Sequence, residues 1–115
     1  MKVSSIDSTP QLDVSHNPKI KKHELLSRGE IDQVTIFSRA IFPPGETAEA
    51  HSHSDMTEVF YVEHGQGVIC VDDKQIPLKA GSCVAVEPNE NHELKNIGST
   101  DMVVLYLGIK TQPES

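Results

Sequence analysis

The chain has 115 residues, a length that suits one domain with a single modest hydrophobic core. Its net charge of −7 argues against a nucleic-acid partner, because phosphate contacts need clustered Lys and Arg side chains. The sequence contains no apolar run as long as a signal peptide or a membrane span, so we expect a cytoplasmic protein with no membrane partner. Cys70 and Cys83 lack metal-type spacing, and we expect both to be reduced thiols in the core.

Polarity divides the chain into three parts. Residues 1–21 are polar, and we expect them to form a flexible N-terminal segment. A single domain is predicted over residues 22–112, followed by a short tail at residues 113–115. Residues 22–28 resemble one helical turn, which is too short to be more than a capping or edge element.

After residue 30, apolar and polar residues tend to alternate with a period of two, which is typical of β-strands. Short strands are predicted over residues 33–42, 46–53, 58–63, 68–71, 75–78, 83–86, 92–96 and 102–107. Asp72 and Asp73 form a short hairpin turn in this series, and other turn residues separate the remaining strands. So many short strands predict an all-β sandwich or barrel.

Four residues of metal-ligand type stand out in this pattern: His51, His53, Glu58 and His92. In an extended strand, side chains two positions apart point to the same face, so His51 and His53 would face one interior. If Glu58 and His92 also face inward, three imidazoles and one carboxylate meet in a single cavity, which suits a divalent metal. The alternative is that all four are ordinary polar residues on a solvated sheet face.

Glycines at both ends of this pattern favour the metal site. Five residues separate Gly45 from His51, and six separate Glu58 from Gly65. With His53 between them, the chain resembles the first motif of the cupin family at every position, within a resemblance that covers about residues 31–108.

The second cupin motif is matched at three positions, Gly81, His92 and Asn96. Two positions depart from the family pattern. Glu87 stands where the family has its first proline, with Pro88 next to it, and Asn89 stands at the glycine position. Because Asn tolerates a left-handed backbone conformation, we expect the turn at Asn89 to persist.

The resemblance implies a double-stranded β-helix, or jelly-roll barrel, of two antiparallel sheets that is usually paired as a homodimer. Val59 and Tyr61, which are apolar and expected to face outward, also predict a covered sheet. The resemblance makes His51, His53, Glu58 and His92 the ligands of one divalent transition metal. Imidazole and carboxylate ligands suit Fe, Mn, Ni, Co, Cu or Zn and leave about two positions open on an octahedral metal.

This site predicts a metal-dependent enzyme of dioxygenase, isomerase or lyase type that acts on a small oxygen-rich metabolite. The alternative is a non-catalytic module that binds or senses a small ligand in the same barrel. A purely structural metal is a third interpretation, but structural sites usually saturate the metal with protein ligands, often thiolates.

The sequence assigns no catalytic residue. Phe60 and Leu94 are expected to wall the pocket. Arg39 and Tyr106 could anchor an anionic substrate if they face inward, and Glu49 could be a general base, although a surface position suits it better. His16 and His23 are expected outside the barrel.

Overall fold

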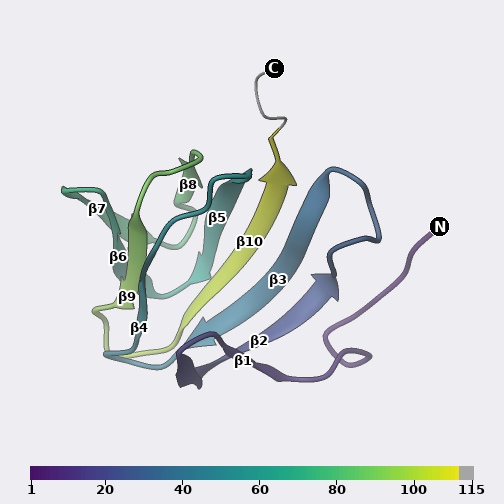
Figure 1. Cartoon of the computed structure of the whole chain (residues 1–115). Coiled ribbons are helices and arrows are strands. Elements are labelled where there is room, and N and C mark those ends of the chain that lie inside the picture. Colours follow the sequence, from purple (N-terminus) through teal and green to yellow (C-terminus); the bar gives the residue numbers. More distant parts are fainter. Residues whose placement is uncertain (112–115) are drawn as a thin grey trace.

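The computed structural model describes residues 1–111, and in this part of the chain it contains ten strands and no helix (Figure 1). The six-stranded sheet contains, in spatial order, β1 (Leu12–Val14), β2 (Asn17–Leu26), β3 (Val34–Phe42), β10 (Met102–Lys110), β5 (Met56–His64) and β8 (Cys83–Val86). The four-stranded sheet contains β4 (Thr47–His51), β9 (His92–Asn96), β6 (Gln66–Val71) and β7 (Lys74–Lys79). All neighbouring strands are antiparallel, so the predicted all-β jelly roll is confirmed.

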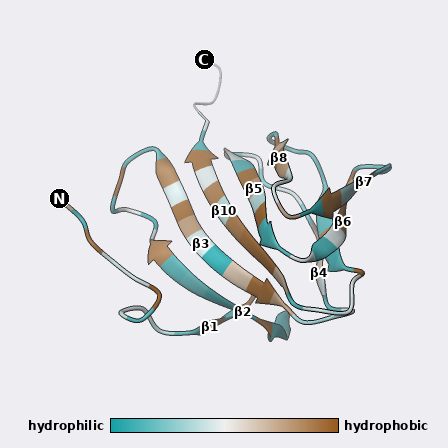
Figure 2. Ribbon diagram, turned by 180° about the vertical axis from the view of Figure 1, so that it is seen from behind, coloured by the Kyte–Doolittle hydropathy of each residue, from teal (hydrophilic) through white to brown (hydrophobic). Residues whose placement is uncertain are grey.

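Strand periodicity places the core between the two sheets. In β5, Glu58, Phe60 and Val62 are buried, whereas Tyr61 between them is 43% exposed. In β9, His92 and Leu94 are buried in the same alternating way. In the six-stranded sheet, β3 and β10 carry many hydrophobic residues, whereas β2 is largely hydrophilic (Figure 2). The inward and outward faces expected for these strands are therefore confirmed.

The helical turn expected over residues 22–28 is wrong. This segment lies mostly in β2, which pairs with β3 so that Lys22 is opposite Ala40 and Glu24 is opposite Ser38. A single helical turn is unstable alone, and pairing with the edge of β3 supplies backbone hydrogen bonds that the turn would lack. Regular structure thus begins before residue 22, and the tail expected at residues 113–115 lies outside the described residues.

The turn before β9 has the conformation that we expected. Asn89 has a φ of 69°, in the left-handed region that Asn tolerates better than most residues. Its backbone N–H donates a hydrogen bond to the carbonyl oxygen of His53, with an N···O distance of 2.7 Å. The departure from the family glycine therefore keeps the turn and connects it to the loop that carries His53.

Asn96 connects two segments of the chain at one end of the barrel. Its side chain is fully buried, and its amide nitrogen donates to the carbonyl oxygens of Phe42 and Thr100, each at 2.8 Å. Its amide oxygen accepts a hydrogen bond from the Gly98 N–H, also at 2.8 Å. A single side chain thus satisfies backbone groups from the end of β3 and from the β9–β10 turn.

Replacing Asn96 with alanine is expected to lower the free energy of unfolding by about 3 kcal/mol, because backbone groups at a buried position lose their partners. The matched control is Asn91→Ala, since the Asn91 side chain is exposed, and its cost is expected to stay within about 0.5 kcal/mol. Urea unfolding of both variants measures the difference. Equal stabilities for the two variants would contradict this role for Asn96.

Candidate metal centre

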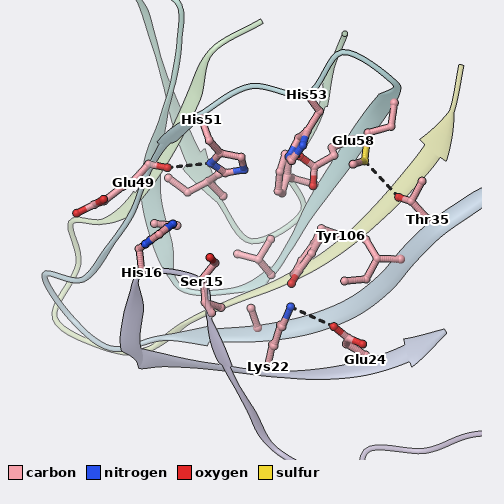
Figure 3. A pocket seen from close by; sticks show the side chains of 18 of the residues that line it. Ser15, His16, Lys22, Glu24, Thr35, Glu49, His51, His53, Glu58 and Tyr106 are labelled. Atoms are coloured by element: carbon pink, nitrogen blue, oxygen red, sulfur yellow. Dashed lines mark hydrogen bonds and ion pairs between the residues drawn. The ribbon is translucent and has the colours of Figure 1, made fainter. Parts of the chain in front are cut away.

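Four side chains meet at one end of the cavity between the sheets, and we call them the His–Glu cluster: His51, His53, Glu58 and His92. Three of them lie in strands: His51 ends β4, Glu58 lies in β5 and His92 begins β9. His53 lies in the loop after β4, so the strand predicted to reach residue 53 ends two residues earlier. One potential ligand atom from each residue lies within 4.8 Å of the others. Figure 3 shows His51, His53 and Glu58 side by side.

Backbone carbonyl groups orient two of the imidazoles. The Nδ1 atom of His51 lies 2.8 Å from the Glu49 carbonyl oxygen, and that of His92 lies 3.1 Å from the Glu90 carbonyl oxygen. A carbonyl oxygen only accepts hydrogen bonds, so in both rings Nδ1 carries the proton. Nε2 is then the ring atom through which each imidazole can bind a metal ion once it is free of its own proton.

Glu58 lies at the centre of the cluster, where it is 7% exposed. Its Oε1 atom is 3.0 Å from Nε2 of His53 and 3.1 Å from Nε2 of His92. Burial by itself raises the pKa of Glu58, but the hydrogen bond from His92 and the charges of the three imidazoles outweigh burial, so the net pKa is lowered. The carboxylate is therefore ionised and attracts positive charge to this position.

His92 shows the complementary shift. Burial by itself lowers its pKa, but the hydrogen bonds to Glu58 and to the Glu90 carbonyl oxygen outweigh burial and raise the pKa. The cluster thus holds protons where a cation would otherwise lie. Three nitrogen donors and one buried carboxylate form a ligand set that fits a divalent transition metal.

A cavity of about 710 Å³ extends from the cluster between the two sheets. Its apolar lining includes Phe42, Phe60, Leu94 and Val104. The expectation that Phe60 and Leu94 wall the pocket is confirmed. Cavities of about 300–1,000 Å³ are typical of small-molecule sites, so a ligand has room beside the cluster.

The sequence left open whether Tyr106, Arg39 and Glu49 face the cavity, and the structure places them differently. Tyr106 lines the cavity and stacks on Phe60, with ring centroids 6.0 Å apart. Arg39 pairs with Glu63 at 3.1 Å, and its β2 partner in register is His23, on the face opposite the cavity. Glu49 is exposed at the cavity rim, and its carboxylate points away from the cluster (Figure 3).

The β1–β2 turn and β2 contribute four polar cavity residues that sequence reasoning missed: Ser15, His16, Lys22 and Glu24. The expectation that His16 lies outside the barrel is wrong. It lies in the β1–β2 turn with a φ of 66°, and the next residue, Asn17, donates a side-chain hydrogen bond to the Thr47 carbonyl oxygen at 2.9 Å. This bond holds the turn against β4. The sequence holds one signal for these residues: Lys22 and Glu24 are two positions apart, so a strand over this segment would place both side chains on one face.

Comparison with known proteins agrees with this geometry. A family model for the cupin domain matches residues 38–108, which is more than half of the chain. The chain belongs to the cupin family. Within that family it is similar to the oxalate-binding protein of Thermotoga maritima, with 31% identity over 88 residues that cover 76% of this chain and 73% of the relative.

Two solved cupin structures illustrate the similarity. The structure of a predicted oxalate decarboxylase from Thermotoga maritima superposes with a TM-score of 0.82 and 26% identity, and the match covers 90% of this chain and 92% of the other. The cupin domain of Cnp3 from Schizosaccharomyces pombe gives a TM-score of 0.79 at 15% identity, covering 93% of this chain and 72% of the other. The second likeness concerns the fold alone.

Within residues 1–111, the structure contains no helix with the length and apolarity that a membrane span requires.

Proposed function

We propose that the His–Glu cluster binds one divalent transition metal and that the loaded protein is an enzyme acting on a small oxygen-rich acid. One observation carries this proposal: four potential ligand atoms lie within 4.8 Å of one another, and three of their residues, His51, His53 and Glu58, line a cavity with room for a ligand. Closed structural metal sites have no such space, because protein groups surround the ion.

A metal bound here would supply Lewis-acid or redox chemistry at positions that the protein leaves open. The chain's own residues would do the rest. The Glu49 and Glu90 carbonyl oxygens keep the His51 and His92 rings oriented, and the Glu58 carboxylate offsets the positive charge of the ion. The apolar side chains of Phe60 and Leu94 would exclude water from the ligand.

The similar proteins support a carboxylate as the ligand. The relative from Thermotoga maritima is an oxalate-binding protein, and the solved structure from that organism is of a predicted oxalate decarboxylase. Oxalate presents two adjacent oxygens to a metal, which fits a site with open neighbouring positions. Among the dioxygenase, isomerase and lyase types, decarboxylation belongs to the lyases, and we favour that type.

The second candidate function is ligand binding without turnover. The relative from Thermotoga maritima is named for binding oxalate, which favours it. In this case the metal would anchor a small acid that the protein senses or carries. Both candidates need the same metal and the same cavity, so they differ only in whether the bound acid is consumed.

Turnover assays on metal-loaded protein separate the two candidates. Protein reconstituted with Fe, Mn, Ni, Co, Cu or Zn is incubated with oxalate and with small oxo and hydroxy acids, and acid loss, released CO₂ and oxygen uptake are followed. The enzyme proposal predicts consumption of at least one acid with at least one metal, and no consumption by His51→Ala. An acid that raises thermal stability without being consumed would favour the binding module. Neither binding nor consumption would contradict both.

We also propose that the chain forms a homodimer through the outer face of the six-stranded sheet. Leu105 of β10 lies opposite Tyr61 of β5, and Leu107 lies opposite Val59. Tyr61 is 43% exposed and the other three side chains are half-buried. An outward sheet face with such apolar pairs is expected to be covered, and a second copy would place the same face against itself.

Tyr61→Lys is expected to separate the dimer, because it places a charge in the centre of the apolar face. Light scattering should give twice the 12.6 kDa chain mass for the wild type and the single chain mass for this variant. The control is Lys95→Glu, an exposed position on the four-stranded sheet, which should stay dimeric. A monomeric wild type would refute the proposal.

A cytoplasmic location remains part of the proposal. Cys70 and Cys83 are both free thiols, as is usual for proteins of reducing compartments. Cys83 is exposed, so the core position expected for it is wrong, while Cys70 is half-buried.

A further inference from the structure

The cavity has a second polar wall, formed by Lys22, Glu24 and Tyr106, which we call the distal wall. It lies across the cavity from the His–Glu cluster (Figure 3). Lys22 and Glu24 come from β2, and Tyr106 comes from β10, so the six-stranded sheet supplies the whole distal wall. The metal ligands His51 and His92 lie in the opposite sheet.

Strand register directs Lys22 and Glu24 into the cavity. Their partners on β3 are Ala40 and Ser38, which are 1% and 0% exposed. The side chains of Lys22 and Glu24 are only 18% and 28% exposed. Lys21, the neighbour of Lys22, faces the other side of the sheet and pairs with Asp13.

The distal wall offers hydrogen-bond donors to a ligand. The Lys22 ammonium group lies 3.2 Å from a Glu24 carboxylate oxygen, which occupies one of its three N–H donors and leaves two. The ends of Lys22 and Tyr106 point toward each other (Figure 3), and burial raises the pKa of Tyr106 although the Lys22 charge lowers it in part. The Tyr106 hydroxyl therefore stays protonated and can donate as well.

A charged pair in this position is costly for the fold. An ammonium group in a largely apolar cavity loses hydration, and pairing with Glu24 offsets only part of that loss. Hydrophobic residues of similar size would fill the same space at no such cost. Polar groups that converge on an otherwise apolar cavity are typical of a ligand site.

From these contacts we infer that the ligand is an acid with two heads: a chelating carboxylate at the His–Glu cluster and a second carboxylate at Lys22 and Tyr106. The inference rests on the proposed function and specifies its substrate class. Oxalate, the smallest dicarboxylate, would fill little of the cavity of about 710 Å³. The substrate is therefore a longer 2-oxo or 2-hydroxy acid that ends in a second carboxylate.

Two acids of equal chain length test the inference. 2-Oxoglutarate and 2-oxovalerate have the same chelating head, but only the first ends in a carboxylate. Protein loaded with redox-inert Zn²⁺ binds each acid in a calorimeter, so the readout is affinity instead of activity. We expect 2-oxoglutarate to bind about tenfold or more tightly than 2-oxovalerate, since hydrogen bonds to a charged group are among the stronger ones.

Substitutions in the distal wall then test which of its residues cause the tighter binding of 2-oxoglutarate. Lys22→Met should reduce the ratio of the two affinities to near one, whereas Lys21→Met, the outward control, should leave it unchanged. Glu24→Gln should raise the affinity for 2-oxoglutarate, because it releases Lys22 from its ion pair. Tyr106→Phe should weaken 2-oxoglutarate selectively, and Tyr61→Phe should not. A pair with only a structural role would lower stability in both Lys22→Met and Glu24→Gln and leave the ratio as it is.

The binding experiment distinguishes failure of this inference from failure of the proposed function. Equal affinities of the wild type for both acids, or a ratio that Lys22→Met does not change, would overturn the inference while the metal site stands. If oxalate and both oxo acids all fail to bind the zinc-loaded protein, the proposed function falls and the inference falls with it.

Discussion

His51→Ala is expected to weaken metal binding at least 100-fold, to judge from the roughly 10–100-fold cost of removing partners that only support a ligand. The substitution removes one of four ligands and leaves the other three in place. Because His51 is exposed, the fold should tolerate the change, which makes it a clean test. Competition with a chromophoric chelator measures the affinity.

The control for this substitution is His64→Ala. His64 is exposed and hydrogen bonds to the Asp101 carbonyl oxygen, outside the His–Glu cluster, so metal affinity should not change. His92→Ala should also lose the metal, but His92 is 2% exposed, and its removal should destabilise the fold as well. Wild-type affinity in His51→Ala would remove that residue from the ligand set.

Metal loading is expected to raise the melting temperature by about 15 °C at pH 8. Metal at about 1,000 times its dissociation constant stabilises the folded state by about 4 kcal/mol, and each kcal/mol shifts the melting temperature by roughly 4 °C in a domain of this size. The same addition to His51→Ala should give almost no shift. Differential scanning calorimetry with and without metal measures both.

The rise in melting temperature on metal loading should be smaller at pH 5.5 than at pH 8. The pKa shifts of Glu58 and His92 give the direction of this change. The lowered pKa of Glu58 stabilises the metal-free fold above its ordinary value of 4.5, and this contribution is lost as pH falls. The raised pKa of His92 stabilises the metal-free fold below its ordinary value of 6.5, and this contribution is lost as pH rises.

At mildly acidic pH, the proton held between His92 and Glu58 therefore stabilises the metal-free fold. Metal ions must displace the imidazole protons, so binding strengthens as pH rises. A gain in melting temperature at pH 5.5 that equals or exceeds the gain at pH 8 would contradict metal binding through these imidazoles.

The residues of the candidate metal centre could be selected from sequence because they stand at the ligand positions of the cupin motifs that the chain resembles, and strand alternation agrees with that choice. The spacing of His51 and His53 already places two imidazoles together, and strand alternation puts Glu58 and His92 inward. The conformation of Asn89 could be predicted for a different reason, since it depends on one residue's φ preference. The turn at Asn89 could thus be predicted from one residue, whereas the full ligand set needed the motif resemblance.

The distal wall could not be predicted, because its position depends on contacts between distant segments. Lys22 and Glu24 become cavity residues only through the pairing of β2 with β3. The segment is hydrophilic and lacks the apolar alternation that marks the other strands, so its local pattern resembled a helical turn. Glu49 is exposed, which agrees with the surface position that we favoured for it, although it shares the parity of His51; the β4–β9 register is irregular between Ala48 and His51.

Elemental analysis of untagged protein purified without chelators tests the central claim most directly. The His–Glu cluster predicts about one equivalent of Fe, Mn, Ni, Co, Cu or Zn per chain in the wild type, because its four ligands converge on one ion. No bound metal, even after reconstitution with each of these ions, would contradict the metal centre and the functions proposed for it.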